Sequence, residues 1–299
     1  MTISKYKAFI KVVEYGSITK ASKQLKYSQP GISHMIDSLE SELGFSILKR
    51  NNGVFVPTEN GKMILHYCEQ IVKNEENLKK TAASINGLLT GSFSIGSYNS
   101  MLMDFVPNVV SEYSKIYKQI EISMMERDCD EIVANLTNGY VDLAFMSEDL
   151  VPKGFIFIPL FKDVVGLIAH KDHPFAKYDK IPVNLLNGCS FIMLSSGSRD
   201  IIDAISKSEK FNPIVHHYTN SDTVSIKLVS NNTGVGILSG FQKKLLPDNV
   251  VFREFESSCR RTLGIAVKSR EHATPAVKKF IGLAVEMAKE NEYYFNPEP

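Results

Sequence analysis

Cysteine is sparse in this sequence of 299 residues, and long apolar runs are absent. The four cysteines lie about 60 to 70 residues apart and form no Cys-x-x-Cys pair, which argues against a zinc site or a disulfide scaffold and favours a reducing compartment. The longest apolar runs, 155–161 and 164–169, are far shorter than the roughly 18 residues that a membrane span needs. No secretory apolar segment follows Met1. We therefore expect a cytoplasmic protein with no metal, no cofactor and no membrane contact.

Net charge is also nearly absent, since 34 basic residues face 33 acidic ones for a total of +1. The balance is uneven: residues 1–90 hold 12 Lys and Arg against 8 Asp and Glu, whereas residues 91–299 hold 22 against 25. The basic front of the chain weakly favours a polyanionic partner there. At about 150 residues per domain, the length predicts two domains or more.

The first 44 residues predict three helices. Apolar side chains in residues 6–13 recur at i, i+3, i+4 and i+7, which is the spacing of one helix face. Ser17 can cap a second, short helix, and Ser28 can cap a third with Pro30 in its first turn, where the missing N–H costs nothing. Gly44 closes the third helix. Two short helices, a tight turn and a longer helix form a helix-turn-helix pattern.

The polar face of the third helix is the first candidate site. Gln and Ser side chains can donate to and accept from base edges, and a helix N-terminus suits a phosphate. Residues 45–57 predict a hairpin with its turn at 51–53 and two cations at its base. Spacing alone favours DNA binding and an ordinary solvated face about equally. The candidate DNA-binding residues are Ser17, Ser28, Gln29, Pro30, Ser33, His34, Lys49, Arg50 and Asn51.

Residues 9–61 also hold a more specific pattern. Its members are Phe9, Gly16-Ser17-Ile18, Ala21-Ser22, Leu25, Ser28-Gln29-Pro30-Gly31-Ile32-Ser33, Ile36, Leu39-Glu40, Leu43-Gly44, Arg50, Thr58-Glu59 and Gly61. This pattern strongly resembles the N-terminal signature of the LysR-type transcriptional regulators. Ser22, Leu48 and Pro57 stand where that family usually has Ala, Phe and Leu, but all three are packing or wing-end positions. The resemblance implies a winged helix-turn-helix domain that binds double-stranded DNA.

A long helix is predicted after the hairpin, with Thr58 as its cap and an end near Leu89. Two interleaved sets of residues recur along it every seven positions and form one mainly apolar seam about 45 Å long. Such a seam must be buried, either against an antiparallel copy of itself or against the C-terminal part of its own chain. The family resemblance implies dimerisation through this helix. The candidate dimerisation residues are Ile64, Tyr67, Ile71, Asn74, Leu78 and Ile85.

From Ser92 onward, short strands alternate with helical stripes, which predicts α/β subdomains with mainly parallel sheets. One helix is expected to bury Val224, Ile226 and Leu228. The runs 93–96, 136–143 and 229–236 resemble the LysR-type effector domain, although Asn232 and Ser239 stand where Gly and Pro are common. That domain resembles periplasmic binding proteins, with two lobes joined by crossing strands, expected here near 160–163 and 261–268.

The fold class is therefore expected to be α/β, with an N-terminal all-α winged helix-turn-helix, a long linker helix and a two-lobed, periplasmic-binding-protein-like effector domain. The expected domains are 1–58 for DNA binding, 59–90 for the linker and 91–299 for the effector. Lobe I would hold 91–161 and 266–299, and lobe II would hold 162–265.

Three segments at predicted strand ends are rich in hydroxyl and amide groups: 97–100, 195–199 and 220–223. In α/β sheets, ligands bind beyond the carboxyl ends of the strands, and each segment precedes a helix with free N–H groups. Such groups favour a small polar effector, more readily an anion, although capping explains many of these residues equally well. The candidate effector-binding residues are Ser97, Asn99, Ser100, Ser196, Arg199, Ser221 and Thr223.

Other motifs do not indicate catalysis. Residues 195–198 are not Gly-x-Ser-x-Gly, and adjacent His216 and His217 would point to opposite faces of a strand. We therefore expect no enzyme but a ligand-responsive, sequence-specific regulator. The resemblance implies a homodimer or homotetramer on a pseudo-palindromic operator, with RNA polymerase as a further candidate partner. The alternatives are a ligand-independent architectural DNA binder and a two-lobe solute-binding protein with a DNA anchor. Activation and repression stay equally open.

Overall fold

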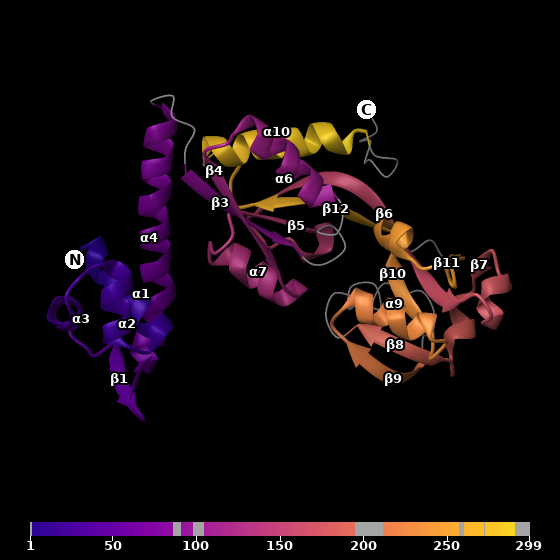
Figure 1. Ribbon diagram of the computed structural model, residues 1–299, viewed down its shortest axis with the longest axis horizontal. Helices are drawn as coiled ribbons and strands as arrows, with labels where there is room; N and C mark the ends of the chain where they lie inside the picture. Colours follow the sequence, from indigo (N-terminus) through magenta and orange to yellow (C-terminus); the bar gives the residue numbers. More distant parts are fainter. Residues whose placement is uncertain are drawn as a thin grey trace. The chain divides into compact units, whose positions relative to one another are not determined.

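The computed structural model describes residues 2–85, 91–97, 105–194, 212–256, 260–271 and 273–290. The chain divides into two compact units, Met1–Leu88 and Leu89–Pro299 (Figure 1). Among the described residues, no helix is both long enough and apolar enough to cross a membrane.

The first unit is a small helical domain with a two-stranded wing and one long helix. Its elements are α1 (Ile3–Tyr15), α2 (Ile18–Leu25), α3 (Gln29–Leu43), β1 (Leu48–Asn51), β2 (Val54–Pro57) and α4 (Glu59–Ile85). The apolar stripes of the first three helices meet in one core, where Phe9, Ile32 and Leu39 are fully buried. The antiparallel strands β1 and β2 form the wing. The three helices and the hairpin that the sequence predicts are therefore confirmed.

Helix caps fix the turns of this unit. The Ser17 Oγ accepts the Lys20 N–H at 3.3 Å, and the Ser28 Oγ accepts the Gly31 N–H at 3.1 Å. Between α1 and α2, Gly16 has φ 61°, and a Cβ atom there would lie 2.4 Å from Val54 Cγ1. Only glycine fits both this backbone conformation and this contact, so the turn lies directly against the wing.

The long helix α4 begins at a cap in which the Thr58 Oγ1 accepts the Gly61 N–H at 2.9 Å. Its 27 described residues span about 40 Å at 1.5 Å per residue. Gly61 lies so close to the wing that a Cβ atom there would be 2.1 Å from the Ile47 carbonyl oxygen. The helix is thus anchored at its start to the winged domain, and the predicted end at Leu89 lies outside the described residues.

The second unit is an α/β domain. Its strands are β3 (Gly91–Ser97), β4 (Ile120–Glu126), β5 (Leu143–Ser147), β6 (Ile156–His170), β7 (Lys180–Ile181), β8 (Ser190–Leu194), β9 (Ile214–Thr219), β10 (Gly236–Ser239), β11 (Val250–Phe255) and β12 (Arg260–Val267). Its α-helices are α6 (Phe105–Ile116), α7 (Cys129–Thr137), α9 (Asp222–Ser230) and α10 (Pro275–Ala288). The 3-10 helix η4 (Gly240–Leu245) follows β10.

Separate hydrophobic cores divide this unit into two lobes. In the first lobe the core surrounds Phe93 and Phe280, and in the second lobe one core surrounds Leu167 and Phe255 and another surrounds Val229. A mixed sheet with the strand order β4-β3-β5-β12-β6-β11-β7 runs through both, and β10 also pairs with β6. The fold class that the sequence predicts, with a winged helix-turn-helix followed by a two-lobed α/β domain, is confirmed.

The strand β6 belongs to both lobes. It pairs antiparallel with β12 from Ile156 to Val164, and with β10 and β11 from Val165 to His170. The expectation of mainly parallel sheets is therefore wrong for the crossing region, although β3, β4 and β5 pair parallel, as do β8 and β9. Both lobes are joined through a continuous strand, as Figure 1 shows.

Helix α9 differs from its predicted stripe. Its buried residues are Ser225 and Val229, whereas Val224 is exposed. Residues 224, 226 and 228 are two apart, and this spacing spreads side chains around a helix instead of placing them on one face.

Candidate functional site

The first unit has a surface hollow of about 800 Å³ between its helix-turn-helix and its wing. We call it the N-terminal hollow. It is lined by residues from the α1–α2 turn, the start of α3 and the wing: Gly16, Ser17, Ile18, Thr19, Gln29, Pro30, Ser33, Arg50, Gly53 and Phe55. The hollow thus brings together five of the predicted DNA-binding residues, which are Ser17, Gln29, Pro30, Ser33 and Arg50.

The remaining DNA-binding candidates lie around this hollow. Ser28 caps α3 directly before the lining residues Gln29 and Pro30. His34, Lys49 and Asn51 are exposed but do not line the hollow. Thr19 is a lining residue that the sequence reasoning missed, because no local pattern shows that it meets a side chain ten residues further along.

Side-chain contacts order the polar groups of the hollow. The Thr19 Oγ1 lies 3.1 Å from the Gln29 Oε1. The Arg50 guanidinium stacks 5.3 Å from the centre of the Phe55 ring, a cation–π contact that holds the cation on the wing. Donors from three separate elements therefore converge on one exposed surface, which suits the acceptor-rich edges and phosphates of a nucleic acid.

The position of the wing relative to α3 is also fixed. The Glu40 Oε1 accepts the backbone N–H groups of Ile47 at 2.7 Å and Leu48 at 3.2 Å. The Phe55 N–H donates to the Gly16 carbonyl at 2.9 Å. Hydrogen bonds to a carboxylate are stronger than neutral ones, so Glu40 ties the start of the wing firmly to α3.

An unpaired apolar stripe runs along α4. The side chains of Tyr67, Ile71 and Leu78 are 60%, 41% and 70% exposed, and Asn74 is exposed between them. The candidate Ile64 instead packs against the core of its own unit. Met63, which the seven-residue repeat did not select, extends the exposed stripe, and the side chain of the candidate Ile85 lies outside the described residues.

The effector-binding candidates are only partly covered by the described residues. Ser97 ends β3 and is fully buried. Ser221 caps α9, where its Oγ accepts the Val224 N–H, and Thr223 is exposed in the first turn of the same helix. The candidates outside the described residues are Asn99, Ser100, Ser196 and Arg199.

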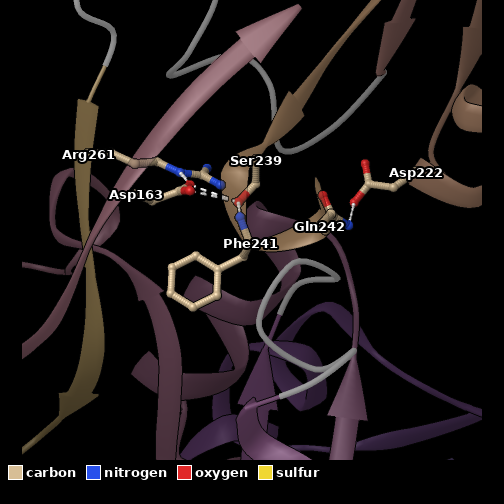
Figure 2. Close-up of polar contacts among 6 residues, drawn as sticks. All are labelled: Asp163, Asp222, Ser239, Phe241, Gln242 and Arg261. Carbon is tan, nitrogen blue, oxygen red and sulfur yellow. Dashed lines mark hydrogen bonds and ion pairs between the residues drawn. The ribbon is translucent and has the colours of Figure 1, made fainter. Parts of the chain in front are cut away.

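A buried polar cluster lies where the lobes join (Figure 2). Asp163 on β6 is fully buried, and its Oδ2 accepts the Arg261 Nε–H from β12 at 2.8 Å. The Ser239 hydroxyl lies 2.9 Å from both oxygens of Asp163. A buried carboxylate needs such partners, because leaving it unpaired costs several kcal/mol. The cluster therefore ties the end of β10 to both crossing strands.

The same cluster continues along η4 toward α9. The Phe241 ring packs 4.9 Å from the ring of Phe161, and the Gln242 Nε2 donates to the Asp222 Oδ2 at 2.6 Å. Burial raises the pKa of Asp222, while the hydrogen bond from Gln242 opposes this rise. The N-terminus of α9 is thus linked to the crossing strands, and it already carries a carboxyl group of its own.

The cysteines and histidines of the described residues show no reactive arrangement. Burial raises the pKa of the Cys68 thiol to about 11, and burial also raises the pKa of Cys189. Within the described part of the chain, no group of three or more His, Cys, Asp or Glu residues could hold a metal ion. His216 and His217 alternate along β9, one exposed and one half-buried, in accord with their predicted opposite faces.

Known proteins match both units. Residues 3–62 match the model "Bacterial regulatory helix-turn-helix protein, lysR family", and residues 86–289 match the model "LysR substrate binding domain". The chain is 32% identical over 294 residues to the uncharacterized HTH-type transcriptional regulator YvbU of Bacillus subtilis (strain 168), which covers 96% of this chain and 99% of that one.

Two solved structures extend the comparison. A full-length OxyR variant from Pseudomonas aeruginosa has the same fold, with a TM-score of 0.76 and 19% identity over 100% of this chain and 99% of that one. The effector binding domain of QuiR in complex with shikimate has a TM-score of 0.61 and 27% identity over 68% of this chain and 99% of that one.

Proposed function

Since the chain belongs to the LysR family of helix-turn-helix transcriptional regulators, we propose that it is a sequence-specific regulator whose binding to double-stranded DNA is altered by a small effector. The observation that carries the DNA-binding half of this proposal is the N-terminal hollow. There the start of α3, the capped start of α2 and the wing present Gln29, Ser33 and Arg50 together.

These residues have different roles in the proposed complex. Gln29 and Ser33, on the first turns of α3, read base edges in the major groove. Arg50 on the wing, with Lys49 and Asn51 beside it, contacts the phosphate backbone. Ser17 and Ser28 act through the helix N-termini that they cap, whose N–H groups suit phosphates.

The regulator acts as a homodimer through α4, or as a homotetramer built from such dimers. The exposed stripe of α4 supports this proposal, since a long apolar seam is stable only when it is covered. A two-fold symmetric dimer reads a pseudo-palindromic operator whose half-sites lie about one helical turn, or a multiple of it, apart. RNA polymerase is a further proposed partner.

The effector is a small polar molecule bound between the lobes of the second unit, more readily a carboxylate than an amine. The relative with the bound shikimate, itself a small hydroxylated carboxylate, supports this class. Because Asp222 already places a carboxyl group at the start of α9, we assign hydrogen bonding to Ser221 and Thr223 and assign the ligand's negative charge to the segments 97–100 and 195–199. The proposed contacts are Ser97, Asn99, Ser100, Ser196, Arg199, Ser221 and Thr223.

Selection from a library of randomised DNA duplexes tests the DNA-binding half. The wild-type protein should enrich a motif of two related half-sites. The double variant Gln29→Ala, Ser33→Ala should lose the motif, because each good base contact contributes about 1–3 kcal/mol of discrimination. It should keep its affinity for unselected DNA, whereas Arg50→Ala should weaken binding to all sequences and reduce its salt dependence.

The matched control is Ser41→Ala, which alters an exposed residue near the far end of α3, outside the N-terminal hollow. This variant should enrich the same motif as wild type. A wild-type protein that enriches no motif would contradict the proposed function.

A further inference from the structure

In the N-terminal hollow, Gln29 contacts a neighbouring side chain from α2. Thr19, in the first turn of α2, places its Oγ1 3.1 Å from the Gln29 Oε1, and both residues line the hollow. Both side chains are exposed, so neither is needed to fill the core of the unit. A hydrogen bond between two exposed polar side chains adds little to the free energy of folding. Its effect is therefore expected in the complex with DNA, where it sets the orientation of the Gln29 side chain.

The contact fixes the direction of the Gln29 amide. A hydroxyl donates its proton to an amide oxygen, so the oxygen of Gln29 faces Thr19 and α2. The free N–H groups at the start of α2 carry partial positive charge, which also favours an oxygen on that side. The Nε2 group, with its two protons, is the end of the amide that remains for a partner in the hollow.

We propose that Thr19 is a positioning residue for base recognition: it holds Gln29 with its amide nitrogen toward the DNA, so that the contacted base must offer an acceptor. This inference rests on the proposed function, since it concerns how the same surface reads sequence. In the major groove, guanine offers the acceptors N7 and O6, thymine offers O4 and adenine offers N7, whereas cytosine offers only the N4 donor. The chain therefore selects guanine, thymine or adenine over cytosine at the base that Gln29 contacts.

A glutamine side chain without the Thr19 contact does not distinguish between acceptor and donor bases. Without Thr19, the amide can turn by half a rotation and present its oxygen to the cytosine N4 group at little cost. Loss of the Thr19 hydroxyl is thus expected to change which bases are accepted, with little effect on how tightly the chain holds DNA in general. A purely structural role for Thr19 would instead lower the affinity for all sequences together.

The test uses the full chain and the duplex that it enriches from the randomised library. The contacted base pair is the one at which Gln29→Ala erases the preference. Four duplexes that differ only in this base pair are then titrated by fluorescence anisotropy at one salt concentration with wild type, Thr19→Val and Thr19→Ser. Thr19→Val keeps the shape of the side chain without its hydroxyl, and Thr19→Ser keeps the hydroxyl.

Wild type and Thr19→Ser should bind the preferred duplex, whose contacted base is guanine, thymine or adenine, roughly tenfold or more tightly than the cytosine duplex, as expected for one good base contact. In Thr19→Val this ratio should fall toward one, with unchanged helical circular dichroism and unchanged affinity for unselected DNA. The inference is overturned if Thr19→Val keeps the wild-type ratio, if wild type prefers cytosine, or if Gln29→Ala erases no preference. Failure of wild type to enrich any motif would instead overturn the proposed function itself.

Discussion

At the scale of single residues, the environment decides what a polar side chain does. The Glu40 carboxylate accepts two backbone N–H groups at the start of the wing and so holds the wing against α3. Asp163 is buried with Arg261 and Ser239 as partners at the crossing of the lobes. Asp222 has only Gln242 as its hydrogen-bond donor among the contacts that the structure describes, and burial raises its pKa. Ionisation of Asp222 therefore opposes the folded state.

The pH dependence of stability tests this reading of Asp222. A raised pKa means that Asp222 keeps its proton to a higher pH in the folded protein than in the unfolded chain. In an unfolded chain the pKa of an aspartate is about 3.9. Its contribution to stability is therefore present at low pH and is lost as pH rises through the folded pKa. Asp222→Asn keeps the oxygen that accepts from Gln242 and removes the charge.

Thermal unfolding followed by circular dichroism, from pH 4 to pH 7, should show Asp222→Asn gaining stability relative to wild type as pH rises. The exposed residue Asp248 provides the control, and Asp248→Asn should show no such trend. A wild-type protein whose stability rises relative to that of Asp222→Asn as pH increases would contradict the raised pKa of Asp222.

The sequence predicts the residues that line the N-terminal hollow better than the buried contacts between the lobes, and the reason is physical. Ser17, Ser28 and Pro30 act within one turn of their own helix, so local spacing is enough to place them. Asp163 and Arg261 are 98 positions apart, and only the pairing of β6 with β12 brings them together. The Thr19–Gln29 contact likewise depends on how two helices cross.

At the scale of elements, α4 and β6 are the two long pieces that the sequence describes incompletely. The crossing strand that is expected near 160–163 is only the middle of β6, which spans Ile156–His170. Pro159 and the polar pair Lys162-Asp163 interrupt the apolar pattern, yet β12 pairs with that part of the strand. For α4, the seven-residue repeat selects Ile64, which the winged domain itself covers. Packing against other elements of the same unit therefore decides how long β6 is and which residues of α4 are exposed.

The exposed stripe of α4 yields a prediction about assembly. Ile71→Asp places a carboxylate in the middle of the proposed seam, where an unpaired charge costs several kcal/mol when it is buried. The dissociation constant of the dimer should rise by about a hundredfold or more, since each 1.4 kcal/mol corresponds to tenfold. Sedimentation at micromolar concentration measures this change.

Two control variants accompany this measurement. Ile71→Leu keeps the seam apolar and should leave the dimer intact. Glu76→Ala changes an exposed residue nine positions after Tyr67, which is half a turn away from it around the helix, and should also leave the dimer intact. Unchanged dimers in Ile71→Asp would show that the stripe packs elsewhere.

At the scale of the whole molecule, we propose that the first unit reads DNA and that the second unit binds the effector. In the second unit, η4 links the start of α9 to the strands that cross between the lobes, so the proposed effector contacts on α9 are joined to elements that both lobes share. A ligand changes DNA affinity only if it binds more tightly to one arrangement of the protein than to another. Coupling between two sites is reciprocal and typically amounts to about 1–3 kcal/mol, or roughly 5- to 150-fold.

The most direct test is the affinity of the full chain for its enriched duplex, measured by fluorescence anisotropy with and without each metabolite that stabilises the protein. Stabilising metabolites are found by thermal shift, because a ligand at 100 times its Kd adds about 2.7 kcal/mol to the stability of the state that binds it. We expect at least one small polar metabolite, most readily a carboxylate, to change the DNA affinity by roughly fivefold or more. A DNA affinity that stays the same with every stabilising metabolite would show a ligand-independent DNA binder and contradict the account.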